Sequence, residues 1–259
     1  YVAPLDDGAA VAACTPDGDN VTWGLADFIG AEELDRIRGY WWLADGSGLI
    51  VERCDETPVS TWWIADPAHP ESPARPHRYP AAGTDNADVS LWIVSPDGDS
   101  RTCIEWDREA LPYLTQVSTP RGSNPLVTLL SRDQRRQVTL EVDPASGATT
   151  VVQERTDPEW IDVMPGVPTR TAGGDLVEIV ADRASDTYRV YVGGQPLTPA
   201  GVQVEGVVDV GADDLLVLAT EDPFITGLYR VTLDGESELV MSGGAVSARR
   251  SGDILVTTT

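Results

Sequence analysis

SLWIVSPDGDS, residues 90–100, combines the two features that decide the fold, a run of strand-forming residues and a tight turn. Residues 90–94 are mostly apolar, β-branched or aromatic, and such residues favour strands. SPDGDS follows, in which Gly accepts the positive φ that a tight turn needs and Asp tolerates it. The stretch therefore predicts a strand of an antiparallel sheet that ends in a hairpin turn.

The same pattern recurs along nearly the whole chain, because strand-like runs alternate with turn signals. Strand-like runs include 49–53, 90–94, 137–142, 188–192, 215–220 and 228–233, and turn signals occur at 15–20, 44–48, 95–100, 143–148, 172–175, 211–214, 233–237 and 250–253. Pairs of hairpins recur over roughly the length of a propeller blade. We therefore expect an all-β fold, a β-propeller with blades near 40–107, 111–154, 159–198 and 203–241 and a partial blade at each end. A two-sheet sandwich is the alternative.

Two segments interrupt this pattern. In residues 26–39, acids and arginines at near-helical spacing predict a short helix over 31–37, in which Glu32 would pair with Arg36 four residues later. Residues 66–86 are dense in Pro, which excludes them from a central strand. The second segment is therefore expected to form a long extended arm that leaves one blade and returns to it.

Composition limits the classes of function. The chain has 259 residues and is 41% hydrophobic, which is typical of a globular protein. Its formal net charge is −24, and all 18 basic residues are Arg. This charge repels nucleic acid and anionic membranes, and no apolar run approaches the roughly 20 residues of a membrane span. We expect neither partner, although an acidic proteome or a coding bias alone would produce the same excess of acids.

Most catalytic and metal-binding patterns are missing from the sequence. There is no G-x-S-x-G motif, and both His residues, His69 and His77, lie in the Pro-rich segment, so we expect no catalytic residue in this chain. There is no phosphate-binding glycine loop, so we expect no cofactor. Cys14, Cys54 and Cys103 are widely spaced and form no zinc pattern, so we expect no metal and three buried structural thiols. Their odd number favours a reducing compartment and hence a cytoplasmic location.

Glu32 and Glu33 are the most unusual local feature, two adjacent acids shortly before Trp41 and Trp42 in a β-rich chain. Adjacent helical residues point about 100° apart, so both carboxylates reach one small cation only at a helix end or bend. A primary ammonium has three N–H donors and fits between two carboxylates. A solvated helix face is one alternative, and a sugar site in which two carboxylates flank a bond is another.

The stretch WGLADFIGAEELDRIRGYWWLADG, residues 23–46, resembles the propeller domain of the dipeptidyl peptidase IV branch of the prolyl oligopeptidase superfamily. That branch carries two consecutive glutamates shortly before a Trp-Trp pair and an SPDG-like turn. Further similar phrases follow in the family's order at 52–59, 78–94, 129–149, 157–163 and 228–235. The resemblance covers essentially the whole chain, and the paired glutamates together with RYPAAG at 78–83 are its most specific part.

The resemblance implies an eight-bladed propeller that caps an α/β-hydrolase domain carrying a Ser-Asp-His triad. It implies that Glu32 and Glu33 grip the free N-terminal ammonium of a peptide, so that a dipeptide with Pro or Ala second is released. It also implies that the arm, about 57–86 with Trp62, Trp63 and Tyr79, reaches a second copy to form a homodimer.

Residues 1–259 would then form about five of the eight blades, without the C-terminal hydrolase domain, and would cleave nothing alone. The expected function is recognition of a peptide N-terminus for a serine peptidase that releases Xaa-Pro or Xaa-Ala dipeptides. A non-catalytic propeller that binds a protein or a glycan is the alternative.

Overall fold

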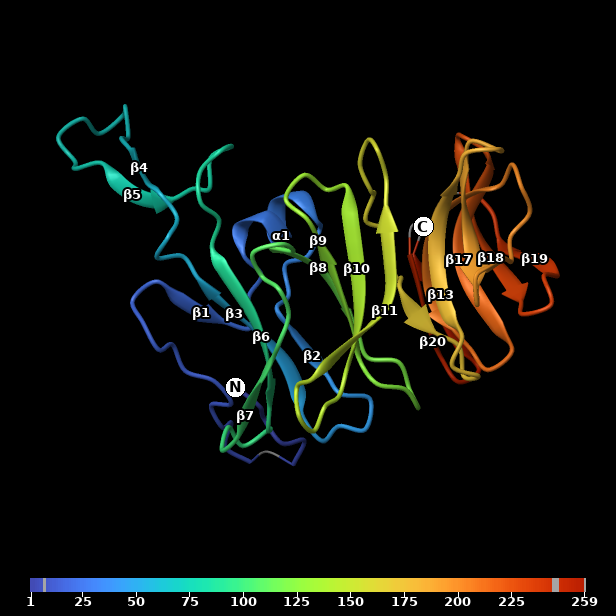
Figure 1. Cartoon of the computed structure of the whole chain (residues 1–259), viewed down its shortest axis with the longest axis horizontal. Helices are drawn as coiled ribbons and strands as arrows, with labels where there is room; N and C mark the ends of the chain where they lie inside the picture. The colour runs from blue at the N-terminus through green and yellow to red at the C-terminus, as the bar shows by residue number, and fades with distance from the viewer. Residues whose placement is uncertain (7, 244–246, 259) are drawn as a thin grey trace. The chain divides into compact units, whose positions relative to one another are not determined.

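The computed structural model describes residues 1–6, 8–243 and 247–258, and in these ranges the chain consists of β-strands and one short helix (Figure 1). The chain divides into two compact units, one of residues 1–117 and 127–161 and the other of residues 118–126 and 162–259. No helix within the described ranges is long and apolar enough to cross a bilayer.

The first unit contains two antiparallel sheets and a separate two-stranded ribbon. The strands of the first sheet are β1 (Val21–Trp23), β2 (Tyr40–Trp42), β3 (Leu49–Asp55), β6 (Asp88–Val94) and β7 (Arg101–Ile104). Those of the second sheet are β8 (Tyr113–Ser118), β9 (Leu126–Leu130), β10 (Arg136–Val142) and β11 (Thr149–Thr156), and the ribbon pairs β4 (Thr61–Ile64) with β5 (Arg75–Arg78). The first sheet runs β1-β3-β6-β7 with β2 also paired to β3, and the second runs β11-β10-β9-β8.

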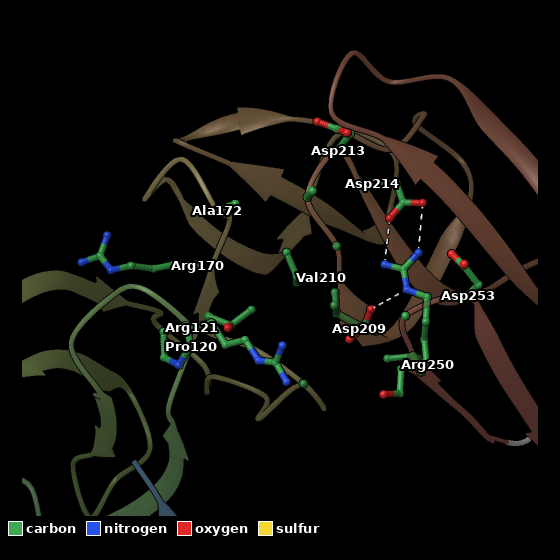
Figure 2. Close-up of a pocket in the computed structure, with 18 residues that line it drawn as sticks. Pro120, Arg121, Arg170, Ala172, Asp209, Val210, Asp213, Asp214, Arg250 and Asp253 are labelled. Atoms are coloured by element: carbon green, nitrogen blue, oxygen red, sulfur yellow. Dashed lines mark hydrogen bonds and ion pairs between the residues drawn. The ribbon is translucent and has the colours of Figure 1, made fainter. Parts of the chain in front are cut away.

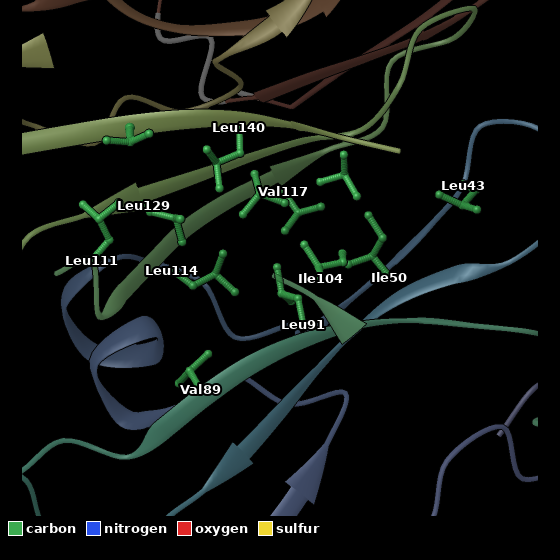
Figure 3. Close-up of a cluster of buried hydrophobic side chains, with 13 residues drawn as sticks. Leu43, Ile50, Val89, Leu91, Ile104, Leu111, Leu114, Val117, Leu129 and Leu140 are labelled. Carbon is green, nitrogen blue, oxygen red and sulfur yellow. The ribbon is translucent and has the colours of Figure 1, made fainter. Parts of the chain in front are cut away.

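Buried side chains from both sheets of the first unit form one hydrophobic core (Figure 3). Its members are Leu43, Ile50, Val89, Leu91, Ile104, Leu111, Leu114, Val117, Val127, Leu129, Val138, Leu140 and Val142. Successive residues of a strand point to opposite faces. On β3, Ile50 accordingly enters this core, while Leu49 and Val51 pack in a smaller cluster with Val94. Both faces of β3 are therefore covered, which makes β3 a rigid support for the strands β1 and β2 that pair with it.

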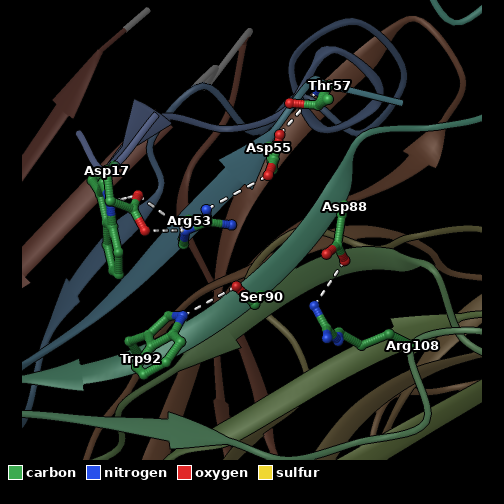
Figure 4. Close-up of polar contacts among 9 residues, drawn as sticks. Asp17, Arg53, Asp55, Thr57, Asp88, Ser90, Trp92 and Arg108 are labelled. Carbon is green, nitrogen blue, oxygen red and sulfur yellow. Dashed lines mark hydrogen bonds and ion pairs between the residues drawn. The ribbon is translucent and has the colours of Figure 1, made fainter. Parts of the chain in front are cut away.

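Charged side chains line the rim of the first sheet (Figure 4). Arg53 on β3 forms ion pairs with Asp17 at 3.1 Å and with Asp55 at 3.5 Å, and Arg108 pairs with Asp88 at 2.7 Å. The Arg108–Asp88 pair is about half exposed, and pairs of this kind contribute little to stability. The burial of apolar side chains is therefore the main source of stability for this sheet.

The second unit repeats the same architecture. Its strands are β12 (Thr169–Arg170), β13 (Leu176–Asp182), β14 (Thr187–Val192), β15 (Gln195–Pro196), β16 (Gln203–Val210), β17 (Asp214–Asp222), β18 (Ile225–Thr232), β19 (Ser237–Met241), β20 (Ser247–Ser251) and β21 (Ile254–Thr258). They form a sheet β12-β13-β14-β15, a sheet β16-β17-β18-β19 and a pair β20-β21. Buried residues of the two four-stranded sheets form a common core that includes Val177, Val190, Val204 and Leu215.

The expectation of an all-β fold built from consecutive antiparallel strands is confirmed. The four larger sheets span residues 21–104, 113–156, 169–196 and 203–241, and four sheets of this kind do not fit a two-sheet sandwich. The predicted start of the first blade at residue 40 is wrong, because β1 pairs with β3 and the sheet already begins at Val21.

The turn in SPDGDS forms as predicted. Gly98 has φ 78°, and a Cβ there would lie 2.7 Å from the carbonyl oxygen of Ala12, so both the conformation and the space require Gly. Asp97 accepts hydrogen bonds from the Ser95 hydroxyl at 2.5 Å and from the Asp99 N–H at 3.1 Å. The side chains of the turn therefore fix its geometry locally.

The three cysteines are free thiols, but only one of them is buried. Cys54 is 2% exposed, and burial together with nearby carboxylates raises the pKa of its thiol to about 12. Cys14 and Cys103 are half-buried. The expectation of buried thiols therefore holds for Cys54 and is wrong for the other two.

Candidate functional site

The short strands β1 and β2 pair with the same edge of β3, and a helical insertion, residues 24–39, connects them. Backbone hydrogen bonds close the base of the insertion: the Gly24 N–H donates to the Glu52 carbonyl at 2.9 Å, the Glu52 N–H to the Gly39 carbonyl at 2.7 Å and the Gly39 N–H to the Gly24 carbonyl at 3.1 Å. A Cβ at position 39 would lie 2.6 Å from the carbonyl oxygen of Leu25, so Gly permits this close approach. Both legs of the insertion therefore meet at Glu52, in the middle of β3.

The helix of the insertion, α1, spans Phe28–Glu33, so it begins and ends earlier than the predicted 31–37. Asp27 is its N-cap, and the Asp27 carboxylate accepts a hydrogen bond from the Gly30 N–H at 3.1 Å. The chain leaves the helix after Glu33 and adopts φ 51° at Asp35. The cap and this turn set the helix boundaries. The spacing of acids and arginines in the sequence did not reveal these boundaries.

The predicted pair between Glu32 and Arg36 is wrong. Arg36 lies beyond the end of α1, so the two residues do not face each other across one helical turn. The Arg36 guanidinium instead forms ion pairs with Asp27, at 3.3 Å, and with Glu52. Glu32 and Glu33, which we call the acid pair, are therefore not neutralised by this arginine.

The acid pair lies in the last turn of α1, and both side chains are exposed. Within the described residues, neither acid has a hydrogen bond or an ion pair with another side chain. The last turn carries no basic residue, so both carboxylates face the negative end of the helix dipole without compensation. A bound cation would relieve this repulsion, and the helix end is the place where two adjacent side chains can reach one cation.

Beneath α1, Asp27, Arg36 and Glu52 form a buried network. Glu52 is fully buried, and Asp27 and Arg36 are each 9% exposed. One Glu52 oxygen accepts a hydrogen bond from the Asp27 N–H at 3.0 Å, and the other pairs with Arg36. The Arg36 N–H donates to the Gly30 carbonyl at 2.9 Å, and its guanidinium lies 5.9 Å from the centre of the Trp41 ring. The network therefore connects both ends of α1 to β3.

The two carboxyl groups of the buried network have raised pKa values. Burial raises the pKa of Glu52 above its ordinary 4.5 and that of Asp27 above its ordinary 3.8, while the positive charge of Arg36 acts in the opposite direction. Two carboxylates share one guanidinium, so the ionised network carries one net negative charge. Arg36 is therefore the group on which the ionised state of both acids depends.

Sequence reasoning missed Glu52 and Asp27. The available signal was an acid inside an apolar strand run, LIVER at 49–53. A buried charge requires a partner, so such an acid predicts an ion pair somewhere in the fold. The sequence did not reveal that the partner is Arg36, which is 16 residues away.

The Pro-rich arm forms the ribbon of β4 and β5, which extends away from β3 and β6 in Figure 1. Trp62 and Trp63 on β4 are 52% and 67% exposed, and Tyr79 follows β5 and is 44% exposed. The Tyr79 ring packs edge-to-face against Trp62, at 5.8 Å between centroids, and against Phe28 of α1, at 5.2 Å. The base of the arm therefore contacts the helix that carries the acid pair.

The Trp-Trp pair has two different environments. Trp41 packs against the main core of the first unit, whereas Trp42 is 43% exposed. Both belong to β2, which pairs with β3 in the same sheet as β1. The two neighbouring tryptophans therefore differ in role, because only Trp41 contributes to the core.

The second unit contains a cleft of about 850 Å³ lined by charged residues (Figure 2). Arg250 lies in its wall and pairs with Asp209 and Asp214, each at 2.7 Å. Hydrogen bonds to these aspartates raise the pKa of Arg250, so its charge is already compensated. Ligand sites of this size are usually lined by apolar groups, and Glu32 and Glu33 are not part of this lining.

Comparison with known proteins gives a consistent result. The family described as "Dipeptidyl peptidase IV (DPP IV) N-terminal region" matches residues 1–245. Dipeptidyl peptidase 8 of Homo sapiens is 26% identical over an alignment of 183 residues, and the match covers 54% of this chain and 20% of that protein. Inactive dipeptidyl peptidase 10 of Rattus norvegicus is 27% identical over an alignment of 161 residues, and the match covers 58% of this chain and 20% of that protein. The chain thus spans about a fifth of the length of these curated relatives.

Two solved structures have the same fold. Dipeptidyl peptidase 4 of Porphyromonas gingivalis superposes with a TM-score of 0.78 at 20% identity, covering 95% of this chain and 37% of that one. A putative dipeptidyl aminopeptidase IV of Bacteroides ovatus superposes with a TM-score of 0.70 at 16% identity, covering 86% of this chain and 35% of that one. The fold is therefore a partial β-propeller, as the turn pattern predicted.

Proposed function

The chain belongs to the family of dipeptidyl peptidase IV N-terminal regions, and on this premise we propose that it recognises the N-terminal ammonium of a peptide through Glu32 and Glu33. The recognition serves a serine peptidase activity that releases Xaa-Pro or Xaa-Ala dipeptides. The catalytic groups belong to an α/β-hydrolase domain of the same polypeptide, and this chain contributes the binding of the substrate terminus.

The observation that carries the proposal is the exposed acid pair at the end of α1. Its two carboxylates have no partner in the described structure, lie at the unfavourable end of a helix dipole and belong to a helix held at both ends. A primary ammonium offers three N–H donors, enough to engage both carboxylates at once. Hydrogen bonds between charged groups are stronger than neutral ones, so the free terminus is favoured over a blocked one.

This geometry gives the site a positional role. A peptide held by its terminal ammonium presents its successive peptide bonds at fixed distances from the acid pair. One of these bonds is then placed at the nucleophile, which lowers the entropic cost of the reaction. Dipeptides are released when the second peptide bond is the one that lies at the nucleophile.

The proposal is tested by comparing two peptides that differ only at the terminus, an Ala-Pro-Gly-Gly peptide with fluorescein at its C-terminal end and its N-acetylated counterpart. Fluorescence polarisation with this chain should show binding of the free amine and at least about tenfold weaker binding of the acetylated peptide, since acetylation removes the charge. Equal affinity for the two peptides would contradict the role of the acid pair.

We also propose that the arm contacts a second copy of this chain through Trp62 and Trp63. Support comes from their exposure on β4, all of whose residues are exposed, in a ribbon that forms no part of the larger sheets. Exposed aromatic residues are enriched in protein interfaces.

Sedimentation velocity should show a dimer that becomes monomeric in the double variant Trp62→Ser/Trp63→Ser. Trp160→Ser, which alters another exposed tryptophan (65%), should not change the dimer. A monomeric wild-type chain at all concentrations would exclude this partner.

A second candidate function is non-catalytic binding of a peptide or protein. It is favoured by the similarity to a relative whose name describes it as inactive. The two candidate functions differ in whether a dipeptide is released after the peptide binds. A polypeptide that binds the free-amine peptide and releases no dipeptide has only the second function.

A further inference from the structure

We infer that Glu52 is a positioning residue for the acid pair, and that it acts through Arg36 and Asp27 to fix the orientation of α1. The inference rests on the proposed function, because it explains how Glu32 and Glu33 are held ready for an ammonium group. Glu52 itself is fully buried on β3, so its role is indirect.

Glu52 bonds to both legs of the helical insertion. Its backbone bonds to Gly24 on the incoming leg and to Gly39 on the outgoing leg. Its carboxylate accepts the Asp27 N–H at 3.0 Å, before α1 begins, and pairs with Arg36, after α1 has ended. A shift of the Glu52 side chain would therefore move both ends of the helix together.

Arg36 transmits this constraint to the helix itself. Its guanidinium contacts the N-cap residue Asp27 at 3.3 Å, and its backbone N–H bonds to the Gly30 carbonyl at 2.9 Å in the middle of α1. The ring of Trp41 on β2 lies 5.9 Å from the guanidinium. A helix of six residues is too short to be stable by itself, so these contacts determine its position.

Stability alone does not explain a charged network at this position. Removing two carboxylates and a guanidinium from water is costly, and well-packed apolar residues often give equal or higher stability in such places. A hydrogen-bonded network differs from apolar packing in its directionality, since each bond fixes an angle as well as a distance. The exposed acids at the end of α1 are the feature that benefits from a fixed direction.

Gly30 provides an independent way to disturb the network without removing a charge. A Cβ at this position would lie 2.6 Å from the Arg36 guanidinium nitrogen and 2.8 Å from the Asp27 carboxylate oxygen. Ala is a better helix former than Gly, so Gly30→Ala does not weaken the helix by propensity. Any loss of function in this variant therefore comes from displacement of the network.

The experiment measures the ratio of affinities for the free-amine and acetylated Ala-Pro-Gly-Gly peptides in the wild-type chain and in Glu52→Gln and Gly30→Ala. This ratio should be about tenfold smaller in both variants than in the wild type, because a displacement of about 1 Å is enough to weaken oriented contacts strongly. Asp182→Asn is the matched control, since it breaks a mostly buried ion pair with Arg189 in the second unit, at 2.8 Å, and should leave the ratio unchanged. Far-UV circular dichroism and thermal melting verify that each variant is folded.

The outcomes separate the two proposals. If the wild-type chain does not prefer the free amine, the proposed function fails and the positioning role fails with it. If the wild type prefers the free amine and a folded Glu52→Gln or Gly30→Ala variant keeps the full ratio, only the positioning role is overturned. If Glu52→Gln does not fold, Gly30→Ala decides the test, because it displaces the network without removing a charge.

Discussion

Replacing Glu32 or Glu33 by Gln should lower kcat/KM for Ala-Pro and Gly-Pro amides, in a polypeptide that also carries the proposed hydrolase domain. The expected decrease corresponds to a loss of about 2–5 kcal/mol of transition-state stabilisation. The acids are exposed in the structure, but a bound peptide would cover them, and removal of one partner then leaves the other charge poorly compensated. Gln keeps the size and one acceptor oxygen of Glu, so the variant tests charge rather than shape. The measurement is kcat/KM for each amide.

Glu109→Gln is the matched control for these variants. Glu109 is also an exposed acid of the first unit, in the segment between β7 and β8, and its replacement should leave kcat/KM unchanged. N-acetylated substrates should be refused by the wild type. Full activity in both acid-pair variants, or efficient cleavage of acetylated substrates, would show that the terminal ammonium is recognised elsewhere.

Replacing Arg36 by Gln should lower the free energy of unfolding at pH 7 by about 3–5 kcal/mol, the usual effect of removing one partner from a buried ion pair. Glu52 is fully buried and Asp27 is 9% exposed, so both would lose the guanidinium of Arg36 without gaining access to water. Urea denaturation followed by circular dichroism measures the change. Arg189→Gln, which breaks the less buried pair with Asp182, should cost less.

The loss in Arg36→Gln should also depend on pH. The pKa of Glu52 in the folded chain is raised by burial above the ordinary 4.5, so the folded state holds this proton more tightly than the unfolded state. The resulting contribution to stability is complete below the ordinary pKa and is lost as pH rises through the folded pKa. Without Arg36, the folded pKa rises further, so the variant should be closest to the wild type near pH 4 and furthest from it at neutral pH. An equal loss at both values would mean that Glu52 is not the group left uncompensated.

The overall architecture could be predicted from local signals. A turn such as SPDGDS needs only Gly98 and its neighbouring acids to form, and apolar runs such as 90–94 form strands wherever they can be covered. The boundaries of α1 could not be predicted in this way, because a six-residue helix has little intrinsic preference and depends on the cap at Asp27 and the contacts of Arg36. The same weakness of short-range signals led to the wrong partner for Arg36.

The sequence by itself determined the all-β fold and, through its family resemblance, drew attention to Glu32 and Glu33, because turn residues and adjacent acids are local features. Only the tertiary structure decided that Asp27 and Glu52, 25 residues apart, share a hydrogen bond beneath these acids. Their meeting depends on β1 and β2 pairing with the same edge of β3. Strand pairing joins residues at separations that no local pattern encodes, and burial then makes the charges depend on one another.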